Sequence, residues 1–229
     1  MPKQTFLNLP VEKKQRIIDA AADEFAAFPY LKTSINRIIK KADIAKGSFY
    51  QYFENKKDLY KYIIDIAGET KLKFFRERLP EYKKIDFFSI LKEVFLAGIE
   101  FKRNYPRYSQ IGDLLLKGEN ESLKNEIYDM SKPKTNDFYL ELLQEAAEKG
   151  EVDAEIDLEF TSYMLTELTI SVVDYYFKKH NSEGLEDLNK MMAYLDKMLY
   201  IVKNGIAGEG YYATYQDEGI KENLSSGKN

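Results

Sequence analysis

Apolar residues recur at the spacing of an α-helix along most of this chain, and this periodicity restricts the folds that are open to it. From residue 10 onward, Ile18, Ala21, Phe25 and Phe28 follow one another at intervals of three or four residues. Such intervals place apolar side chains along one side of a helix. The sustained alternation of apolar and polar residues that is typical of a β-strand is absent. We therefore predict an all-α fold.

Proline, glycine and capping residues divide this pattern into about nine helices. Ser34 and Asp157 are suited to the N-cap position, and Gly205 is suited to end a helix. Pro133 lies inside one long candidate, where we expect a kink or two separate pieces. The predicted helices are 10–27, a short helix that begins after Ser34, 45–51, 56–79, 86–103, 106–117, 119–149, 157–179 and 183–204.

The pattern predicts three regions. Residues 1–55 would form a small domain of three helices, and residues 56–204 a larger helical domain. The last region, 205–229, holds five of the twelve glycines and ends in polar residues, so we expect a mobile tail.

Composition excludes several kinds of site. The chain has no cysteine and one histidine, His180, so Cys-based zinc sites, disulfides, thiol nucleophiles and multi-histidine metal sites are excluded. We expect no catalytic residues, no metal and no cofactor, and assign His180 to a helix end. The most apolar stretch, 160–177, is interrupted by Glu167 and Asp174, and the N-terminus has no apolar run of signal-peptide length. We expect a cytoplasmic protein that does not enter the membrane.

The net charge of −4 conceals an asymmetry. Residues 1–60 contain 11 Lys and Arg against 7 Asp and Glu, a net charge of +4. Subtraction from the totals of 34 and 38 leaves 23 basic and 31 acidic residues in 61–229, a net charge of −8. A basic N-terminal region on an acidic body indicates that the N-terminal region meets a polyanion.

Residues 34–60 have the features of a helix-turn-helix motif. In such a motif, a first short helix supports a second one, whose exposed side enters the major groove of DNA. Phe49 and Phe53 lie four residues apart and therefore share the buried face of the second helix. The opposite face would present groups suited to phosphate oxygens and base edges, namely Lys46, Ser48, Tyr50, Gln51 and Tyr52. Gly47 permits close approach to the DNA backbone.

The stretch 33–59, TSINRIIKKADIAKGSFYQYFENKKDL, resembles the DNA-binding signature of the tetracycline-repressor (TetR) family. That signature runs roughly T-[TS], then I-A-x-x-A-G-V-[SA]-x-G-[ST]-[LIF]-Y-x-[YH]-F, then x-[NS]-K-x-x-L. With the preceding Ile17, Ile18, Ala21 and Phe25, the match covers about 50 residues. The rest of the chain is similar to the family only in length and helical character.

The resemblance implies roles for individual residues. Ser34 and Tyr50 would contact phosphates, and Lys56 would hold another. Ser48, Gln51 and Tyr52 would lie nearest the bases. Lys46 and Gly47 would lie against the backbone at the start of the recognition helix. The complete set implied to bind DNA is Thr33, Ser34, Lys46, Gly47, Ser48, Tyr50, Gln51, Tyr52 and Lys56.

Three residues depart from the family pattern. Pro29 stands where a glycine is usual, Ile39 replaces an alanine, and Asp43 replaces the glycine of the turn. Aspartate tolerates the left-handed conformation better than most residues, so the turn can form. Asp43 also brings a negative charge close to DNA, which lowers affinity.

The resemblance implies that residues 1–55 are a DNA-binding domain and that residues 56–204 bind a ligand and form a homodimer through the last two long helices. The residues agree with the homodimer. Residues 160–172 and 188–202 carry apolar faces that are broad for a small monomer. The remaining aromatic residues favour a cavity between helices that binds an unknown small-molecule effector. The candidate ligand-binding residues are Phe95, Phe101, Tyr108, Tyr139, Tyr163 and Glu167. If Glu167 and Asp174 face that cavity, a cationic ligand is expected; the alternative places both at the rim of the dimer interface.

These observations predict a transcriptional regulator, most simply a repressor that binds an inverted-repeat operator in double-stranded DNA and is released by a small molecule. One alternative is a similar DNA-binding protein whose body binds a protein partner. An enzyme that uses the paired carboxylates Glu167 and Asp174 has no support in catalytic spacing.

Overall fold

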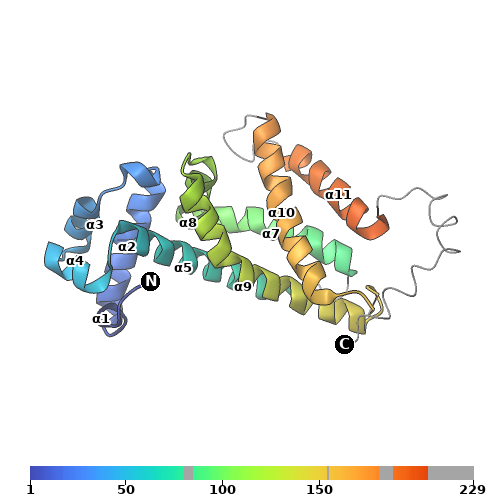
Figure 1. Cartoon of the computed structure of the whole chain (residues 1–229), viewed down its shortest axis with the longest axis horizontal. Helices are drawn as coiled ribbons and strands as arrows, with labels where there is room; N and C mark the ends of the chain where they lie inside the picture. The colour runs from blue at the N-terminus through green and yellow to red at the C-terminus, as the bar shows by residue number, and fades with distance from the viewer. Residues whose placement is uncertain (80–84, 154, 181–187, 206–229) are drawn as a thin grey trace, which may run out of the picture. The chain divides into compact units, whose positions relative to one another are not determined.

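The computed structural model describes residues 1–79, 85–153, 155–180 and 188–205, and these contain ten α-helices, one 3₁₀ turn and no strand (Figure 1). The prediction of an all-α fold is confirmed. In chain order the elements are α1 (Gln4–Leu7), α2 (Val11–Ala27), η1 (Tyr30–Lys32), α3 (Ile35–Ala42), α4 (Lys46–Tyr52), α5 (Lys56–Arg76), α7 (Phe87–Asn104), α8 (Pro106–Lys117), α9 (Glu121–Glu148), α10 (Leu158–His180) and α11 (Leu188–Asn204).

Most predicted helix boundaries agree with the structure within a few residues. The tenth helix is α1, for which the apolar spacing predicted no helix. The Asp157 side chain accepts a hydrogen bond from Phe160 N–H, 2.9 Å away, at the start of α10. Gly205 has a φ of 71° and follows the last residue of α11, as predicted. Residues 183–187 of the last predicted helix, and 206–229 of the predicted tail, lie outside the described residues.

α9 is one continuous helix, so of the two alternatives expected at Pro133, two separate pieces are excluded and a kink remains a prediction. A proline within a helix has no N–H to donate to the preceding turn. Hydroxyl groups on both sides supply other hydrogen bonds to the helix backbone: Ser131 Oγ donates to Ile127 O at 3.0 Å, and Thr135 Oγ1 donates to Ser131 O at 3.3 Å. Neither bond reaches the carbonyl of Asp129, which the missing N–H of Pro133 leaves without its helical donor.

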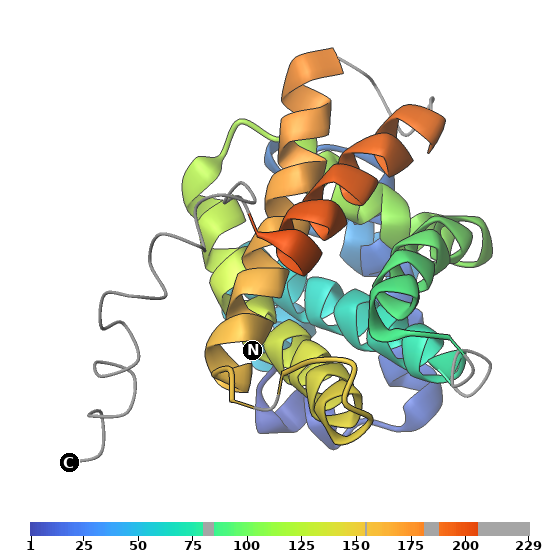
Figure 2. The ribbon, with the colours of Figure 1, turned by 90° about the vertical axis from the view of Figure 1, so that its right-hand side faces the viewer.

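The chain divides into two compact units, residues 1–186 and 187–229. In the second unit the structure describes residues 188–205, of which Leu188–Asn204 form α11. In the first unit, α1 to α4 form a head, and α5, α7, α8, α9 and α10 form a body. α5 contacts both α7 and α9, and α10 packs along α9 (Figure 2). No helix in the described part of the chain is both long and apolar enough to cross a membrane.

The head has an aromatic core. Phe6, Phe25, Phe49 and Phe53 are each at most 1% exposed. The ring centroids of Phe6 and Phe53 lie 4.8 Å apart, and those of Phe25 and Tyr60 also lie 4.8 Å apart. Burying a large apolar side chain contributes about 1.5–3 kcal/mol, so these residues fix how the short helices pack.

The core of the head continues into the body. Leu59, Tyr60 and Ile63 of α5 belong to the same buried cluster as the head aromatics, and so do residues of α8 and α9 (Ile111, Leu123 and Ile127). The predicted domain boundary at residue 55 remains a prediction. Apolar packing crosses that position without interruption, because α5 begins at Lys56 and enters the core within one turn.

A buried carboxylate joins α2 to the start of α3. The Glu24 side chain is 8% exposed, and it accepts hydrogen bonds from Arg37 Nε at 2.9 Å and from Ser34 N–H at 2.7 Å. Ser34 is the N-cap of α3 as predicted, but its side chain makes no capping hydrogen bond. Glu24, on α2, accepts instead from the free backbone N–H of Ser34 at the start of α3.

The ion pair of Glu24 with Arg37 predicts that the stability of the protein depends on pH. Burial raises the pKa of Glu24, but the hydrogen bonds from Arg37 and Ser34 outweigh burial, and the net pKa lies below its ordinary value of 4.5. A carboxyl with a lowered folded-state pKa stabilises the protein above its ordinary pKa, and this contribution is lost as pH falls through the folded value. We predict that Glu24→Gln lowers the free energy of unfolding by about 1–3 kcal/mol at pH 7.

The measurement is urea unfolding of wild type and Glu24→Gln between pH 7 and pH 3. The difference between the two should shrink toward the acid end. Glu12→Gln, at an exposed position of the same helix, is the control and should change stability little at any pH. A difference that is constant with pH would contradict the assignment.

Candidate DNA-binding site

α3 and α4 form the helix-turn-helix, and Asp43 makes the turn between them. Asp43 has a φ of 52°, and among the described residues it is the only one other than glycine with a positive φ. The Ile44 N–H donates to Ile39 O at 3.1 Å, which closes the end of α3. The prediction that aspartate adopts the left-handed conformation here is confirmed.

α4 is fixed through one face and exposed on the other. Phe49 is fully buried, and its ring lies 5.8 Å from that of Phe53. On the other side, Lys46, Gly47, Tyr50 and Gln51 are exposed, and Ser48 is half-buried. A Cβ atom added to Gly47 would meet nothing within 4 Å, so this end of α4 is open to an approaching surface. We call Lys46, Gly47, Ser48, Tyr50 and Gln51 the α4 face.

α1 supports the other end of the recognition helix. Lys3 N–H donates to Tyr52 O at 2.9 Å, and Lys3 Nζ donates to Tyr50 O at 2.9 Å. The Thr5 hydroxyl binds the carbonyl of Gln51. These bonds satisfy carbonyl groups that the end of a helix leaves free. Sequence reasoning missed this role; the signal was the apolar Phe6, which anchors α1 in the core of the head.

Three residues of the implied DNA-binding set hold the head together. Tyr52 was predicted to be exposed, but it is buried with 6% exposure, and its ring lies 6.0 Å from that of Phe6. Thr33 is also buried, and its hydroxyl donates to Tyr30 O at 2.7 Å. Lys56 Nζ donates to Tyr30 O at 2.8 Å and to Thr33 O at 3.1 Å.

Lys56 therefore fastens the η1 turn to the start of α5. Its ammonium also lies 4.5 Å from the centroid of the Tyr30 ring. Burial is the largest influence on this group and lowers the pKa of Lys56. Ser34, in contrast, is half-buried, and its hydroxyl makes no hydrogen bond with the described residues.

Ion pairs connect the head to the body. Arg107 of α8 binds Asp19 at 2.7 Å and Asp23 at 3.0 Å, both on α2. Asp23 also binds Lys41 of α3 at 2.8 Å. Within the body, Lys57 and Lys61 of α5 both bind Glu126 of α9, at 3.2 and 2.7 Å. Exposed pairs of this kind contribute about 0–1 kcal/mol each, so they orient the helices more than they stabilise them.

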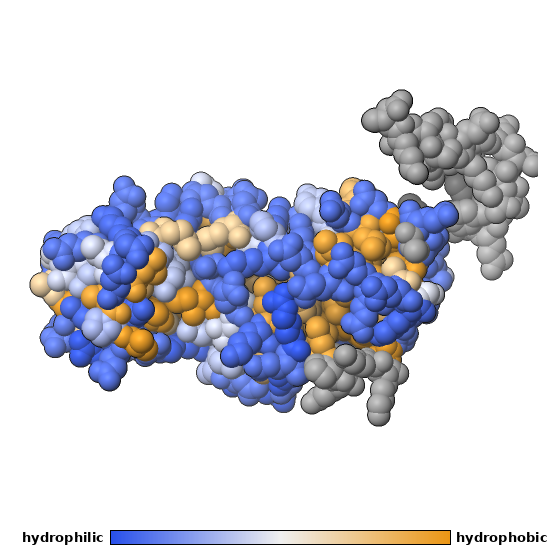
Figure 3. Space-filling model, turned by 90° about the horizontal axis from the view of Figure 1, so that it is seen from below, coloured by the Kyte–Doolittle hydropathy of each residue, from blue (hydrophilic) through white to orange (hydrophobic). Residues whose placement is uncertain are grey.

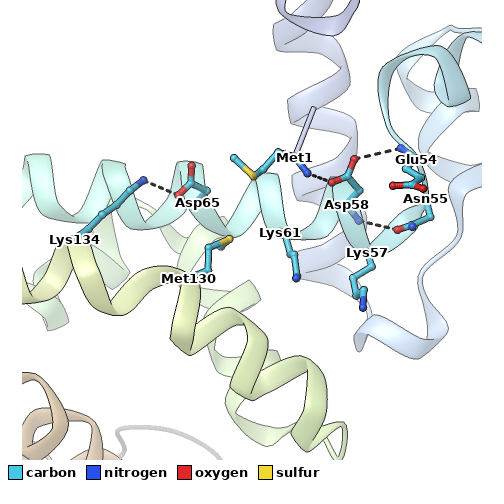
Figure 4. Close-up of a pocket in the computed structure, with 9 residues that line it drawn as sticks. All are labelled: Met1, Glu54, Asn55, Lys57, Asp58, Lys61, Asp65, Met130 and Lys134. Atoms are coloured by element: carbon cyan, nitrogen blue, oxygen red, sulfur yellow. Dashed lines mark hydrogen bonds and ion pairs between the residues drawn. The ribbon is translucent and has the colours of Figure 1, made fainter. Parts of the chain in front are cut away.

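A pocket of about 570 Å³ lies where α5 meets α9 (Figure 4). Its lining is charged and includes Lys57, Asp58, Lys61, Asp65 and Lys134. These charges are neutralised locally, since Lys134 binds Asp65 at 2.7 Å and Glu126 accepts from both Lys57 and Lys61. We interpret this pocket as the seam between head and body, not as the predicted aromatic cavity.

The residues predicted to bind a ligand do not converge on one described pocket. Phe101 and Tyr139 are buried, and the Tyr139 hydroxyl lies 3.1 Å from Thr169 Oγ1. Phe95 and Tyr108 are half-buried, whereas Tyr163 is 45% exposed. Glu167 binds Lys132 at 3.0 Å, and Asp174 binds Lys178 at 2.7 Å. Both carboxylates are thus paired within the chain, and the expectation of a cationic ligand remains a prediction.

The head defines a class: helix-turn-helix proteins that present a short recognition helix to DNA. The family described as "Bacterial regulatory proteins, tetR family" matches residues 17–63. A TetR family transcriptional regulator of Chloroflexus aurantiacus is 30% identical, over 90% of this chain and 98% of that one, with a TM-score of 0.48. The chain belongs to the TetR family and is a DNA-binding transcriptional regulator.

Other relatives extend over most of the chain. The HTH-type regulator YhgD of Bacillus subtilis is 22% identical over 85% of this chain and 97% of its own length. A probable acrEF/envCD operon repressor of Escherichia coli K12 is 24% identical over 82% of this chain and 86% of its own length. The structure of FadR from B. subtilis in complex with stearoyl-CoA has a TM-score of 0.60 at 21% identity, covering 84% of this chain and 99% of that one.

The exposure of the α4 face predicts that a substitution there can weaken DNA binding without changing the stability of the fold. Gln51→Ala should weaken specific DNA binding, because a lost carboxamide contact to a base edge costs about 1–3 kcal/mol. Its thermal unfolding should be unchanged, because the side chain is exposed. The measurement is fluorescence anisotropy with a selected DNA duplex. Gln144→Ala, an exposed glutamine on α9, is the matched control. Equal affinities for the two variants would remove Gln51 from the interface.

Proposed function

We propose that this protein is a repressor that binds an inverted-repeat operator as a homodimer and is released by a small-molecule effector. The observation that carries this proposal is the α4 face, which is exposed on one side and held rigidly on the other by Phe49 and Phe53. A regulator of this kind acts in the cytoplasm, where bacterial DNA is located.

Within the head, the implied DNA contacts divide into two groups. Ser34, Lys46, Gly47, Ser48, Tyr50 and Gln51 are the residues that we propose to touch DNA. Tyr50 is 45% exposed and its ring packs edge-on against Phe49, 5.1 Å away, so its hydroxyl is presented on a rigid support. Thr33, Tyr52 and Lys56 position this surface, and we propose that they contribute to DNA binding through the geometry of the head.

A single recognition helix reads only a few base pairs, so a dimer is required for a selective site. Two-fold symmetry would place two α4 helices about 34–36 Å apart, one helical turn of DNA.

α10 carries exposed apolar side chains, Phe160 at 59%, Tyr163 at 45%, Met164 at 40% and Tyr175 at 51%. α11 carries Tyr200 at 67% and Ile201 at 49%. Figure 3 shows apolar patches among the hydrophilic residues of one face. We propose that α10 and α11 form the dimer interface, because exposed apolar patches mark association sites.

The proposed switch acts through α5. This helix follows the helix-turn-helix without a linker and contributes Phe74 and Phe75 to the body. An effector bound among the body helices would change the tilt of α5 and thereby the separation of the two heads. The relative solved with stearoyl-CoA supports a small-molecule effector. An effector shifts this equilibrium only by its difference in affinity between the two states.

The test of the proposed function is selection from a random pool of double-stranded DNA with the full-length protein. We expect recovery of an inverted repeat. The logarithm of the affinity should fall with the logarithm of salt concentration, at a slope of about −0.9 per phosphate contacted. Recovery of a single half-site would refute the dimeric operator, and absence of any enriched sequence would refute sequence-specific binding.

The dimer interface gives a separate prediction. Phe160→Asp places a charge on the exposed apolar side of α10 and should convert the dimer to a monomer in sedimentation experiments. Affinity for the full inverted repeat should then fall by about two orders of magnitude or more, because avidity is lost. Val11→Asp changes a 76% exposed apolar residue on α2 and is the control. A variant Phe160→Asp that remains dimeric would exclude this face of α10.

A further inference from the structure

Lys71 lies on the inner side of α5. The outer side of this helix carries Lys73 and Glu77, whose side chains are 78% and 59% exposed. Phe74 faces α7, where its ring lies 5.6 Å from that of Phe101, and Phe75 faces α9, where its ring lies 6.0 Å from that of Phe138. At 3.6 residues per turn, Lys71 falls between these two contacting sides and opposite Lys73.

Lys71 has no partner in the described part of the chain. It makes no hydrogen bond and no ion pair there, and its ammonium lies 5.5 Å from the centroid of the Phe75 ring. The position of a Cβ on Gly98 of α7 lies 4.0 Å from Lys71 Cε, so the side chain runs beside the backbone of α7.

The nearby carboxylate is already engaged. Asp113 of α8 influences Lys71 electrostatically, but its carboxylate binds Lys102 at 2.6 Å. Burial, the largest influence, lowers the pKa of Lys71, and the charge of Asp113 opposes this effect. The ammonium therefore lacks a full counter-charge within the described residues.

Open space adjoins Lys71. The residue is exposed although it lies on the side of α5 that carries the buried Phe74 and Phe75, so its side chain borders space that the described helices leave open. Gly68, one turn earlier on the same side of α5, is half-buried, yet an added Cβ would meet nothing within 4 Å. At 3.6 residues per turn, the apolar residues Ile64, Ala67 and Phe75 lie on the same side of α5 as Lys71.

We propose that Lys71 is the counter-charge for an amphipathic anion, a small molecule whose apolar part occupies the space beside α5 and whose carboxylate meets the ammonium. This inference rests on the proposed function and specifies its effector class. An ammonium at the edge of an apolar space favours an anionic group, because a charge-assisted hydrogen bond replaces the missing partner. The pairing of Glu167 and Asp174 within the chain agrees with an anion and not a cation.

The experiment uses three ligands with one skeleton and different charge: octanoate, 1-octanol and octylammonium. Binding to the full-length protein is measured by isothermal titration calorimetry. We expect wild type to bind octanoate most tightly. Lys71→Met, which keeps the length of the side chain and removes its charge, should weaken octanoate about tenfold, as loss of one charge-assisted hydrogen bond implies. Binding of 1-octanol should be unchanged.

Two further variants complete the design. Lys71→Arg keeps the charge and should preserve the preference for octanoate. Lys73→Met makes the same change on the outer side of α5 and should leave all three affinities unchanged. Thermal unfolding of ligand-free Lys71→Met should occur at or above the wild-type temperature, because the substitution removes an unpaired charge. This readout also establishes that the variant is folded.

The proposal is overturned if wild type prefers 1-octanol or octylammonium, if it binds none of the three, or if Lys71→Met keeps the preference for octanoate. Operator affinity, measured in the same samples, separates this failure from failure of the proposed function. Operator binding that responds to a neutral or cationic ligand would refute the anion and leave the ligand-responsive repressor intact. Absence of operator binding would refute the repressor without altering the octanoate result.

Discussion

The burial of one helix in two places determines the rest of this structure. The first half of α5 places Leu59, Tyr60 and Ile63 in the core of the head, and its second half places Phe74 and Phe75 in the body. Because interiors are close-packed, neither end of the helix can move without repacking its neighbours. Head and body are thus joined by packing as well as by covalent connection.

The recognition helix is too short to be stable alone, and the structure compensates from outside it. Isolated helices shorter than about 12–15 residues are marginal in water. α4 has seven residues, and it is supported by buried Phe49, by the left-handed turn at Asp43 and by the hydrogen bonds from α1. The residues that support α4 lie on one side of it, so the other side is free for recognition.

The sequence was sufficient to predict the helices, the motif and the turn, because each depends on local patterns. Apolar spacing located the long helices, and the tolerance of aspartate for positive φ predicted the conformation of Asp43. The errors concern tertiary packing. Tyr52 follows Gln51 in the motif and was predicted to share its exposure. Tyr52 is instead buried against Phe6, which lies 46 residues earlier in the chain. Likewise, the isolation of Lys71 depends on which carboxylates the other helices pair with Lys102 and Lys132.

One shared carboxylate joins the head to the body. Asp23 binds Lys41 of α3 and Arg107 of the body helix α8. A DNA phosphate placed close to Lys41 would compete with Asp23 for the same ammonium. Asp23 would then be left to Arg107 alone. Linkage requires that this competition act in both directions. An event that draws Arg107 away from Asp23 would leave this carboxylate to Lys41, and Lys41 would then be less available to a phosphate.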